Sequence, residues 1–306
     1  MKRILVTGSN GLLGQNLIEL ITASGRAELI ATSKGANRFP TVVGYTYLDL
    51  DITNQSQLQM AIANIKPDVI INTAAITNVD ICHTNHSLCL SVNVEAVRNL
   101  AEISEKHDIH LIHLSTDFVF DGIDGPYAED ANPNPMSFYG ESKYKAEQII
   151  LGSSCKWTIL RTILVYGLTA NMSRSNIVLW AKNSLEKGEA INVVTDQWRM
   201  PTLVGDLAEA CLLAAEKQAT GIFHIAGPEL MTVYELVCKV ADFWKLDNSL
   251  IKPISSAILN QEAKRPSKTG FILDKARNVL DYHPHTFTDG LDIVDKQLVE
   301  LRTRTE

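Results

Sequence analysis

Short apolar runs rich in β-branched residues alternate with segments of helical period through the first half of the 306-residue chain. This alternation is typical of a parallel sheet that is covered by helices on both faces. Gly25 and Pro67 support the pattern, because both fall between the expected elements rather than inside them. The expected strands are residues 2–7, 28–33, 46–49, 69–73, 109–115 and 158–164, and the expected helices are residues 12–23, 55–65, 88–106 and 139–151.

The regular alternation of strand-like and helical segments ends beyond the sixth expected strand, where a second, smaller lobe is expected to begin. A loop at residues 170–175, a helix at 176–187 and an extended segment at 190–194 come next. Residues 206–216 then show helical period again and residues 222–225 are strand-like, so the chain is expected to return to the sheet. The predicted fold class is therefore α/β, a doubly wound parallel sheet of the Rossmann type with a smaller, interleaved C-terminal substrate lobe. The expected boundaries are 1–170 and 205–226 for the dinucleotide-binding domain, and 171–204 and 227–306 for the substrate lobe.

Charge and composition argue against several kinds of partner. The net charge is −7 and no run of Lys or Arg occurs, so neither nucleic acid nor an anionic membrane surface is an expected partner. No segment approaches the roughly 20 apolar residues that span a bilayer, and the N-terminal apolar run is too short for a signal peptide. The five cysteines are scattered without C-x-x-C spacing, which is typical of reduced thiols and predicts a cytoplasmic protein. A homodimer stays open as the oligomeric state.

A glycine-rich loop at residues 7–14 comes directly after the first expected strand and opens the first expected helix. Its G-x-x-G-x-x-G spacing lets the backbone turn tightly and approach a pyrophosphate, and the helix N-terminus offers N–H groups and a partial positive charge. A glycine turn without a ligand is the alternative. The loop predicts dinucleotide binding, with contacts expected from Gly8, Asn10, Gly11, Leu12, Leu13 and Gly14.

The end of the second expected strand indicates which dinucleotide binds. An acid there would bond the ribose 2′-hydroxyl and repel a 2′-phosphate, but Ser33 and Lys34 occupy this place and Arg38 follows. Hydroxyl and cationic donors suit a 2′-phosphate. The expected cofactor is therefore NADPH, with NADH as the alternative if Lys34 and Arg38 are only solvated surface charges.

Other cofactor contacts are expected at the ends of the next strands. Asp51, followed by Ile52, comes after the third strand, where its carboxylate can accept from an adenine amino group or cap the next helix. Ala74 and Ala75 end the fourth strand, and their small side chains would let a cofactor lie close to the backbone. Asn93, in the helix that follows, is expected either to bond backbone around the site or to serve structure alone.

Tyr139 and Lys143 are four residues apart in an expected helix, so both side chains can face one cleft. A free phenol has a pKa near about 10, and an ammonium within roughly 4–6 Å would lower it. Tyr139 is therefore a predicted general acid. Thr116, at the carboxyl end of the fifth expected strand, can face the same cleft and polarise a substrate carbonyl, and Asp117 follows it.

The remaining histidines and the tryptophans are interpreted mainly as structural residues rather than as parts of a site. Two groups of possible zinc ligands form no convincing quartet, so no metal is expected: Cys82 with His83 and His86, and His283 with His285. The tryptophans are interpreted as core or lobe-interface residues. Trp198 lies between the expected lobes and is the one that could meet a substrate base or sugar.

Taken in order, these motifs resemble those of the extended short-chain dehydrogenase/reductases, and within them the dTDP-4-dehydrorhamnose reductases. The similarity runs from the first strand to about residue 280. Its most specific parts are residues 114–122, 126–129, 139–143 and 199–202.

The resemblance implies that NADPH gives hydride to C4 of a nucleotide-linked 4-keto-6-deoxy sugar, as in dTDP-L-rhamnose synthesis, while Tyr139 protonates the new alkoxide. Lys143 would hold the nicotinamide ribose and tune Tyr139, and Thr116 would bond the carbonyl oxygen. General acid help of this kind is typically worth about 10²–10⁴ in rate. By the same analogy, the nucleotide-sugar substrate would also contact Asp117, Trp198 and Arg265.

The chain departs from the reductase pattern at two places. Ala146 stands where the reductases usually carry Gly, and residues 81–83 replace an acidic pair. A 4,6-dehydratase is disfavoured because Phe118 occupies the place of the acid that elimination requires. Two alternatives stay open: a nucleotide-sugar epimerase, which would recycle its cofactor, and a non-catalytic regulatory subunit resembling that of methionine adenosyltransferase.

Overall fold

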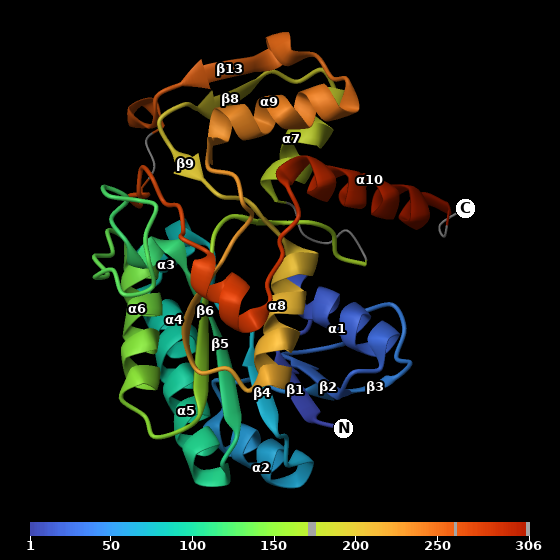
Figure 1. Cartoon of the computed structure of the whole chain (residues 1–306), viewed down its shortest axis with the longest axis vertical. Helices are drawn as coiled ribbons and strands as arrows, with labels where there is room; N and C mark the ends of the chain where they lie inside the picture. Colours follow the sequence, from blue (N-terminus) through green and yellow to red (C-terminus); the bar gives the residue numbers. More distant parts are fainter. Residues whose placement is uncertain (171–175, 260–261, 304–306) are drawn as a thin grey trace.

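The computed structural model describes residues 1–170, 176–259 and 262–303. Within them, a seven-stranded sheet flanked by helices lies beneath a smaller lobe in the view of Figure 1. The strand order is β11-β6-β5-β4-β1-β2-β3, and all neighbouring strands of this sheet are parallel. The predicted doubly wound α/β fold is therefore confirmed. The strands are β1 (Arg3–Thr7), β2 (Glu28–Ser33), β3 (Tyr45–Asp49), β4 (Val69–Asn72), β5 (His110–Thr116), β6 (Trp157–Thr162) and β11 (Gly221–Ile225).

Helices cover both faces of the sheet because its central strands are apolar on both sides. In β4, Val69 and Ile71 belong to a core cluster shared with α1 and α8, whereas Ile70 belongs to a cluster shared with α2, α5 and α6. The covering helices are α1 (Leu12–Ser24), α2 (Gln55–Ile65), α5 (Ala96–His107), α6 (Phe138–Leu151) and α8 (Val204–Lys217).

The main deviations from the expected elements lie around α5 and β6. The helix predicted at 88–106 is instead a run of α4 (His86–Leu90), a π-helical turn η1 (Ser91–Glu95) and α5. The helix α3 (Val79–Thr84) was not predicted, because six residues are too few for a helical period to show. The strand predicted to reach residue 164 stops at Thr162, since Leu164 has a positive φ of 41°.

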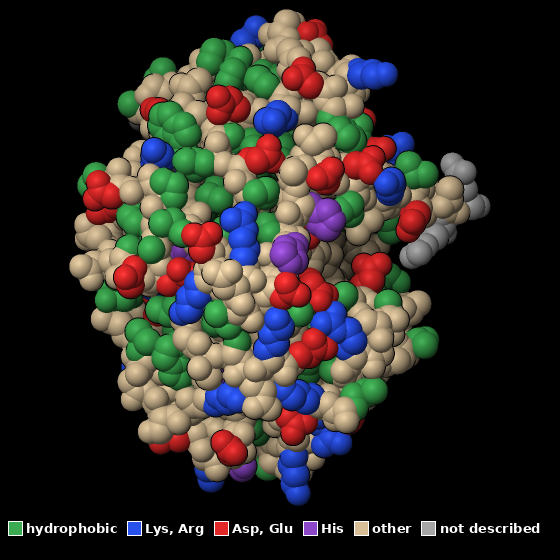
Figure 2. Space-filling view, in the orientation of Figure 1, with side chains coloured by type: hydrophobic (Ala, Val, Ile, Leu, Met, Phe, Trp, Pro, Cys, Tyr) green, Lys and Arg blue, Asp and Glu red, His purple; other side chains and the backbone are tan. Residues whose placement is uncertain are grey.

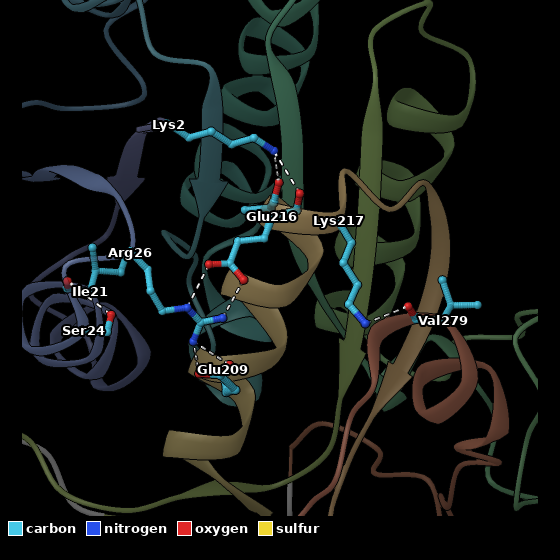
Figure 3. A network of polar contacts seen from close by, with 9 residues as sticks. Lys2, Ile21, Ser24, Arg26, Glu209, Glu216, Lys217 and Val279 are labelled. Carbon is cyan, nitrogen blue, oxygen red and sulfur yellow. Dashed lines mark hydrogen bonds and ion pairs between the residues drawn. The ribbon is translucent and has the colours of Figure 1, made fainter.

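The chain returns to the sheet after its first excursion, as the sequence pattern predicted. Helix α8 packs against α1, and β11 extends the sheet beside β6. A polar network joins α8 to the segment that follows α1 (Figure 3): Arg26, two residues beyond the end of α1, bonds Glu209 at 2.7 Å and Glu216 at 2.6 Å on α8. Lys2 Nζ adds a hydrogen bond to the Ala215 carbonyl at 2.6 Å.

The smaller lobe has its own apolar core, formed by three helices and a two-stranded parallel sheet. Apart from Ala170, the loop expected at 170–175 lies outside the described residues. No helix in the described ranges is both long and apolar enough to cross a bilayer. The elements of this lobe and its borders are α7 (Ile177–Glu186), β8 (Ile191–Val194), α9 (Val233–Trp244), β13 (Ile251–Ile254) and α10 (Phe287–Thr303), with the short strands β7 (Val165–Tyr166), β9 (Trp198–Arg199), β10 (Thr202–Leu203) and β12 (Met231–Thr232). Short 3₁₀ or π turns are η2 (Asp117–Val119), η3 (Asn248–Leu250), η4 (Ser256–Ile258) and η5 (Ala276–Leu280).

Candidate functional site

A cleft of about 630 Å³ opens at the carboxyl ends of the sheet strands, with Gly8, Ser33, Asn72, Thr116 and Thr162 in its lining. Open parallel sheets bind their ligands at this edge. The cleft brings together most of the residues selected from the sequence, although Gly14, Asn93, Trp198 and Arg265 are not in its lining. Those that line it are Gly8, Asn10, Gly11, Leu12, Leu13, Ser33, Lys34, Arg38, Asp51, Ile52, Ala74, Ala75, Thr116, Asp117, Tyr139 and Lys143.

The glycine loop packs closely against neighbouring backbone. Gly8 has a φ of +69°, and a Cβ there would lie 2.7 Å from the backbone nitrogen of Ala74. A Cβ on Gly14 would lie 2.5 Å from Ser9 Cα, so this glycine serves the packing of α1 on the loop. Gly11 is the N-cap of α1, and no side chain caps this end. The N–H groups of the first turn are thus suited to an anionic ligand such as a pyrophosphate.

At the end of β2 the charged residues pair with one another. Lys34 Nζ lies 2.8 Å from Asp51 Oδ2 across the strand ends. Asp51 also accepts a hydrogen bond from the Thr53 backbone, whereas the cap of α2 is Asn54, so the alternative of Asp51 as helix cap is wrong. The Arg38 backbone N–H donates to Asn10 Oδ1 at 2.8 Å, which ties this region to the glycine loop.

Helix α6 carries Tyr139 and Lys143 into the cleft because of how it begins. Ser137 caps the helix by accepting from the backbone N–H of Gly140 at 3.1 Å. A Cβ at Gly140 would lie 2.2 Å from the Phe118 carbonyl oxygen, so only glycine lets α6 start this close to η2. One helical turn separates Tyr139 from Lys143, and both are buried at the cleft wall.

The reactive groups are almost fully enclosed by protein. Exposed fractions are 6% for Thr116, 8% for Tyr139 and 3% for Lys143. Lys143 Nζ lies 3.1 Å from Nε2 of His113, a buried histidine of β5. His113 was not selected from the sequence, although it lies two residues before Ser115 and therefore on the same strand face.

Burial sets the direction in which the pKa values of Tyr139 and Lys143 shift. It raises the pKa of Tyr139 above its usual value, and the Thr116 hydroxyl opposes that rise. Burial also lowers the pKa of Lys143 to about 8, against the opposing charge of Glu147. The sequence predicted that Lys143 lowers the pKa of Tyr139, but burial raises this pKa, and the group that opposes the rise is the Thr116 hydroxyl.

Asp117 joins the cleft to the smaller lobe. It is 2% exposed, accepts a hydrogen bond from Thr269 Oγ1 at 2.5 Å and lies 4.0 Å from Arg199 Nε. Burial raises the pKa of the Asp117 carboxyl, while Arg199 opposes this. Arg199 itself lines the cleft and donates to the Pro266 carbonyl at 2.7 Å. Sequence reasoning noted Arg199 only within a family motif.

The selected residues that do not line the cleft have other contacts. Both groups of the Asn93 side-chain amide bond the backbone of Ile76, at 2.8 and 3.0 Å, which fixes the loop after β4. Trp198 lies in β9 beside the cleft residue Arg199. Arg265 forms an ion pair with Asp80 of α3 at 2.9 Å.

The described residues contain no group of three or more His, Cys, Asp or Glu side chains that could hold a metal ion. The donor set of the cleft instead fits a dinucleotide. An uncapped helix N-terminus with close-packed glycines suits phosphates, and Ser33, Lys34 and Arg38 lie in the same lining.

The chain is similar to known proteins over most of its length. Residues 1–299 match the family described as RmlD substrate binding domain. The chain is 34% identical to a dTDP-4-dehydrorhamnose reductase of Aggregatibacter actinomycetemcomitans over 303 residues, 95% of this chain and 97% of that protein. It is 32% identical to methionine adenosyltransferase 2 subunit beta of Xenopus laevis, covering 83% of this chain and 75% of that protein. A dTDP-4-dehydrorhamnose reductase from Bacillus anthracis, solved in complex with NADP, superposes with a TM-score of 0.82 at 28% identity, over 97% of this chain and 99% of that chain.

Proposed function

The chain belongs to the RmlD substrate binding domain family, and we propose that it reduces the C4 carbonyl of a nucleotide-linked 4-keto-6-deoxy sugar with NADPH, as in dTDP-L-rhamnose synthesis. One observation carries the proposal. Thr116, Tyr139 and Lys143 lie in the same cleft as the glycine loop, so a proton donor and a dinucleotide can meet at one substrate. The names of the full-length relatives support the same reaction.

NADPH, when bound, supplies the hydride. The glycine loop and the start of α1 would hold its pyrophosphate, and Ser33, Lys34 and Arg38 would receive the 2′-phosphate. Asp51, now paired with Lys34, would accept from the adenine amino group, and Ile52 would lie beside it. Ala74 and Ala75 would let the cofactor lie close over the strand ends.

The protein's own contribution is proton transfer in a dry site. Tyr139 Oη would give its proton to the oxygen that forms from the carbonyl, and Thr116 would donate a hydrogen bond to the same oxygen. A phenol whose pKa is raised stays protonated at neutral pH, so the proton is available when the oxygen becomes basic. Lys143 would stabilise the phenolate that remains and hold the nicotinamide ribose.

The smaller lobe would complete the substrate site. Asp117 and Arg199 lie where it meets the strand ends, and Trp198 and Arg265 are the further proposed contacts for the nucleotide sugar. We assign residues 1–170 and 205–226 to dinucleotide binding and 171–204 and 227–306 to the substrate. Acidic and basic side chains are interspersed on the face in Figure 2, which supports a protein that does not bind nucleic acid. The free cysteines support a cytoplasmic protein, and a homodimer is the oligomeric state to test.

The direct test is to mix the protein with NADPH and dTDP-4-keto-6-deoxy sugar and to follow NADPH absorbance. We expect stoichiometric consumption of NADPH, and a drop of about 10²–10⁴ in kcat for Tyr139→Phe. Tyr144→Phe is the matched control, because Tyr144 lies on the same helix but outside the cleft lining. Full activity of Tyr139→Phe would overturn the assigned role.

A second function is favoured by the relative named methionine adenosyltransferase 2 subunit beta, whose identity to this chain is close to that of the reductase. A regulatory subunit would bind NADPH without turnover of any sugar nucleotide. An epimerase would convert its substrate without net consumption of NADPH. A substrate screen across sugar nucleotides, with absorbance and product analysis as readouts, separates the three.

A further inference from the structure

A network of hydrogen-bonded polar side chains crosses the middle of the sheet and ends at Lys143. Thr7 Oγ1 lies 2.6 Å from Asn72 Oδ1, Asn72 Nδ2 lies 3.0 Å from His113 Nδ1, and His113 Nε2 lies 3.1 Å from Lys143 Nζ. Thr7, Asn72 and His113 are paired in register on the adjacent strands β1, β4 and β5. The exposed fractions of these side chains are 0%, 1% and 0%, so water does not complete their hydrogen bonds.

The direction of each hydrogen bond in this network depends on the charge of Lys143. A Lys143 ammonium can only donate, so His113 Nε2 must accept and the ring proton must be on Nδ1. Nδ1–H then donates to Asn72 Oδ1, with the amide turned over relative to the orientation given above, and Asn72 Nδ2–H donates to Thr7 Oγ1. The orientation of an amide and the tautomer of a histidine are both assigned from such networks. With the ammonium present and the amide turned over, every link has one donor and one acceptor. With the amide as given above, the same holds when Lys143 is uncharged, so these side chains can serve both charge states.

We propose that His113 is a positioning residue that accepts a hydrogen bond from the Lys143 ammonium, and that Thr7 and Asn72 hold the His113 ring in place from the other side. This inference rests on the proposed function, because it is there that Lys143 acts beside Tyr139 and the cofactor. Its consequence is that His113 keeps Lys143 charged and in place when an anionic dinucleotide binds.

The other groups that face Lys143 do not replace this contact. Glu147, one turn further along α6, is engaged by Arg161 at 2.7 Å and by Ser115 at 2.5 Å. Cys82 and Cys89 come from α3 and α4, and Tyr139 lies one turn before Lys143 on α6. Within the described part of the chain, His113 Nε2 is the hydrogen-bonding partner of Lys143 Nζ.

The titration behaviour of the two groups is consistent with the contact. Burial and the nearby Lys143 charge lower the pKa of His113 well below 6.5, so the ring stays neutral and able to accept. Burial lowers the pKa of Lys143 to about 8, so part of the population is uncharged near that pH. An anion that enters the cleft favours the ammonium and raises the pKa of Lys143, so its binding should take up protons at pH values above about 8.

The test is calorimetric titration of NADPH into the protein in buffers of different ionisation enthalpy, from about pH 6 to about pH 10, which yields the protons taken up at each pH. In the wild-type protein we expect uptake centred above pH 8, because uptake is largest between the Lys143 pKa of about 8 in the free protein and its higher pKa in the complex. His113→Leu removes the acceptor, which should move the centre down by about one pH unit, because a hydrogen bond to a charged group is lost. His113→Gln keeps an acceptor and should leave the centre close to the wild-type value.

His110→Leu is the matched control, since His110 is a buried histidine of the same strand that bonds Thr158 and does not line the cleft. If His113→Leu does not fold, Asn72→Ala breaks the next link and should shift the centre in the same direction.

The proposal is wrong if His113→Leu weakens NADPH binding without moving the pH at which proton uptake is centred. It is also wrong if His113→Leu and His113→Gln behave alike, or if the wild-type protein binds NADPH without proton uptake. Failure of the wild-type protein to bind NADPH overturns both proposals. Proton uptake without sugar reduction overturns only the proposed reaction.

Discussion

The two ends of the cleft differ in how much water reaches their charged groups. At the β5–α6 end, Tyr139 is 8% exposed and Lys143 is 3% exposed. At the β2 end, the side chain of Lys34 is 80% exposed and that of Asp51 is 26% exposed. Electrostatic interactions are strong and desolvation is costly where water is excluded, whereas exposed charges are screened. The buried end is therefore suited to proton transfer, and the exposed end to selecting a cofactor.

Two ion pairs make the contrast measurable. Arg161 and Glu147, behind the buried end, lie 2.7 Å apart with side chains that are 2% and 0% exposed. Lys34 and Asp51 lie 2.8 Å apart at the exposed end. Nearly equal distances should thus have very different energetic consequences, because the cost of losing a partner depends on whether water can replace it.

The largest effect is expected for Arg161→Met, which leaves the Glu147 carboxylate buried without its cation. Breaking such a pair typically costs about 3–5 kcal/mol in the free energy of unfolding. Urea denaturation of the variant measures this loss. The double variant Arg161→Met with Glu147→Leu is the control, and it should recover a large part of the stability because no unpaired charge remains. A single variant as stable as the wild-type protein would show that water reaches this pair.

The second largest effect is a gain in the free energy of unfolding rather than a loss, and it is expected for Lys143→Met. Because burial lowers the pKa of Lys143 from 10.5 to about 8, its charged form costs the fold free energy below that pH, and the cost fades as pH rises from 8 towards 10.5. Lys143→Met should therefore stabilise the protein by roughly 1–3 kcal/mol at neutral pH, and by less in alkaline buffer, while it removes activity. Urea denaturation across this pH range measures both. Lys182→Met is the control, since Lys182 is also buried but pairs with Glu186, and no such gain is expected there. A loss of stability in Lys143→Met would contradict this account of the buried end.

The sequence could predict the sheet, the cleft and Tyr139 with Lys143, because each depends on local patterns: strand–helix alternation, glycine spacing and helical spacing. It could not predict how the groups affect one another. The raised pKa of Tyr139 depends on burial by segments far away in sequence, and the contact of Lys143 with His113 joins residues 30 positions apart. The pairing of Lys34 with Asp51 likewise follows from the β2–β3 register. Short elements such as α3 also have too few residues to leave a periodic pattern.

A smaller effect is expected at the exposed end for Arg38→Ala. If Arg38 receives the 2′-phosphate, its loss should weaken NADPH binding by about tenfold or more, the equivalent of one charge-assisted hydrogen bond, and leave NADH nearly unchanged. Fluorescence titration with both dinucleotides measures the ratio. Arg98→Ala is the control, because Arg98 pairs with Glu95 on the helical run outside the cleft lining. Equal losses for NADPH and NADH would refute the role in selecting the 2′-phosphate.

The smallest effect is expected for Lys34→Met, which breaks the exposed pair with Asp51. Since solvent already surrounds most of the Lys34 side chain, water can replace the lost partner, and the midpoint of thermal unfolding should not change. Any effect on NADPH affinity should weaken as salt is added, because the charges involved are screened. Thermal unfolding beside Arg161→Met is the decisive measurement. A comparable loss of stability in the two variants would mean that exposure does not separate the ends of the cleft, and a loss only in Arg161→Met would show that burial rather than ion-pair distance sets the energy.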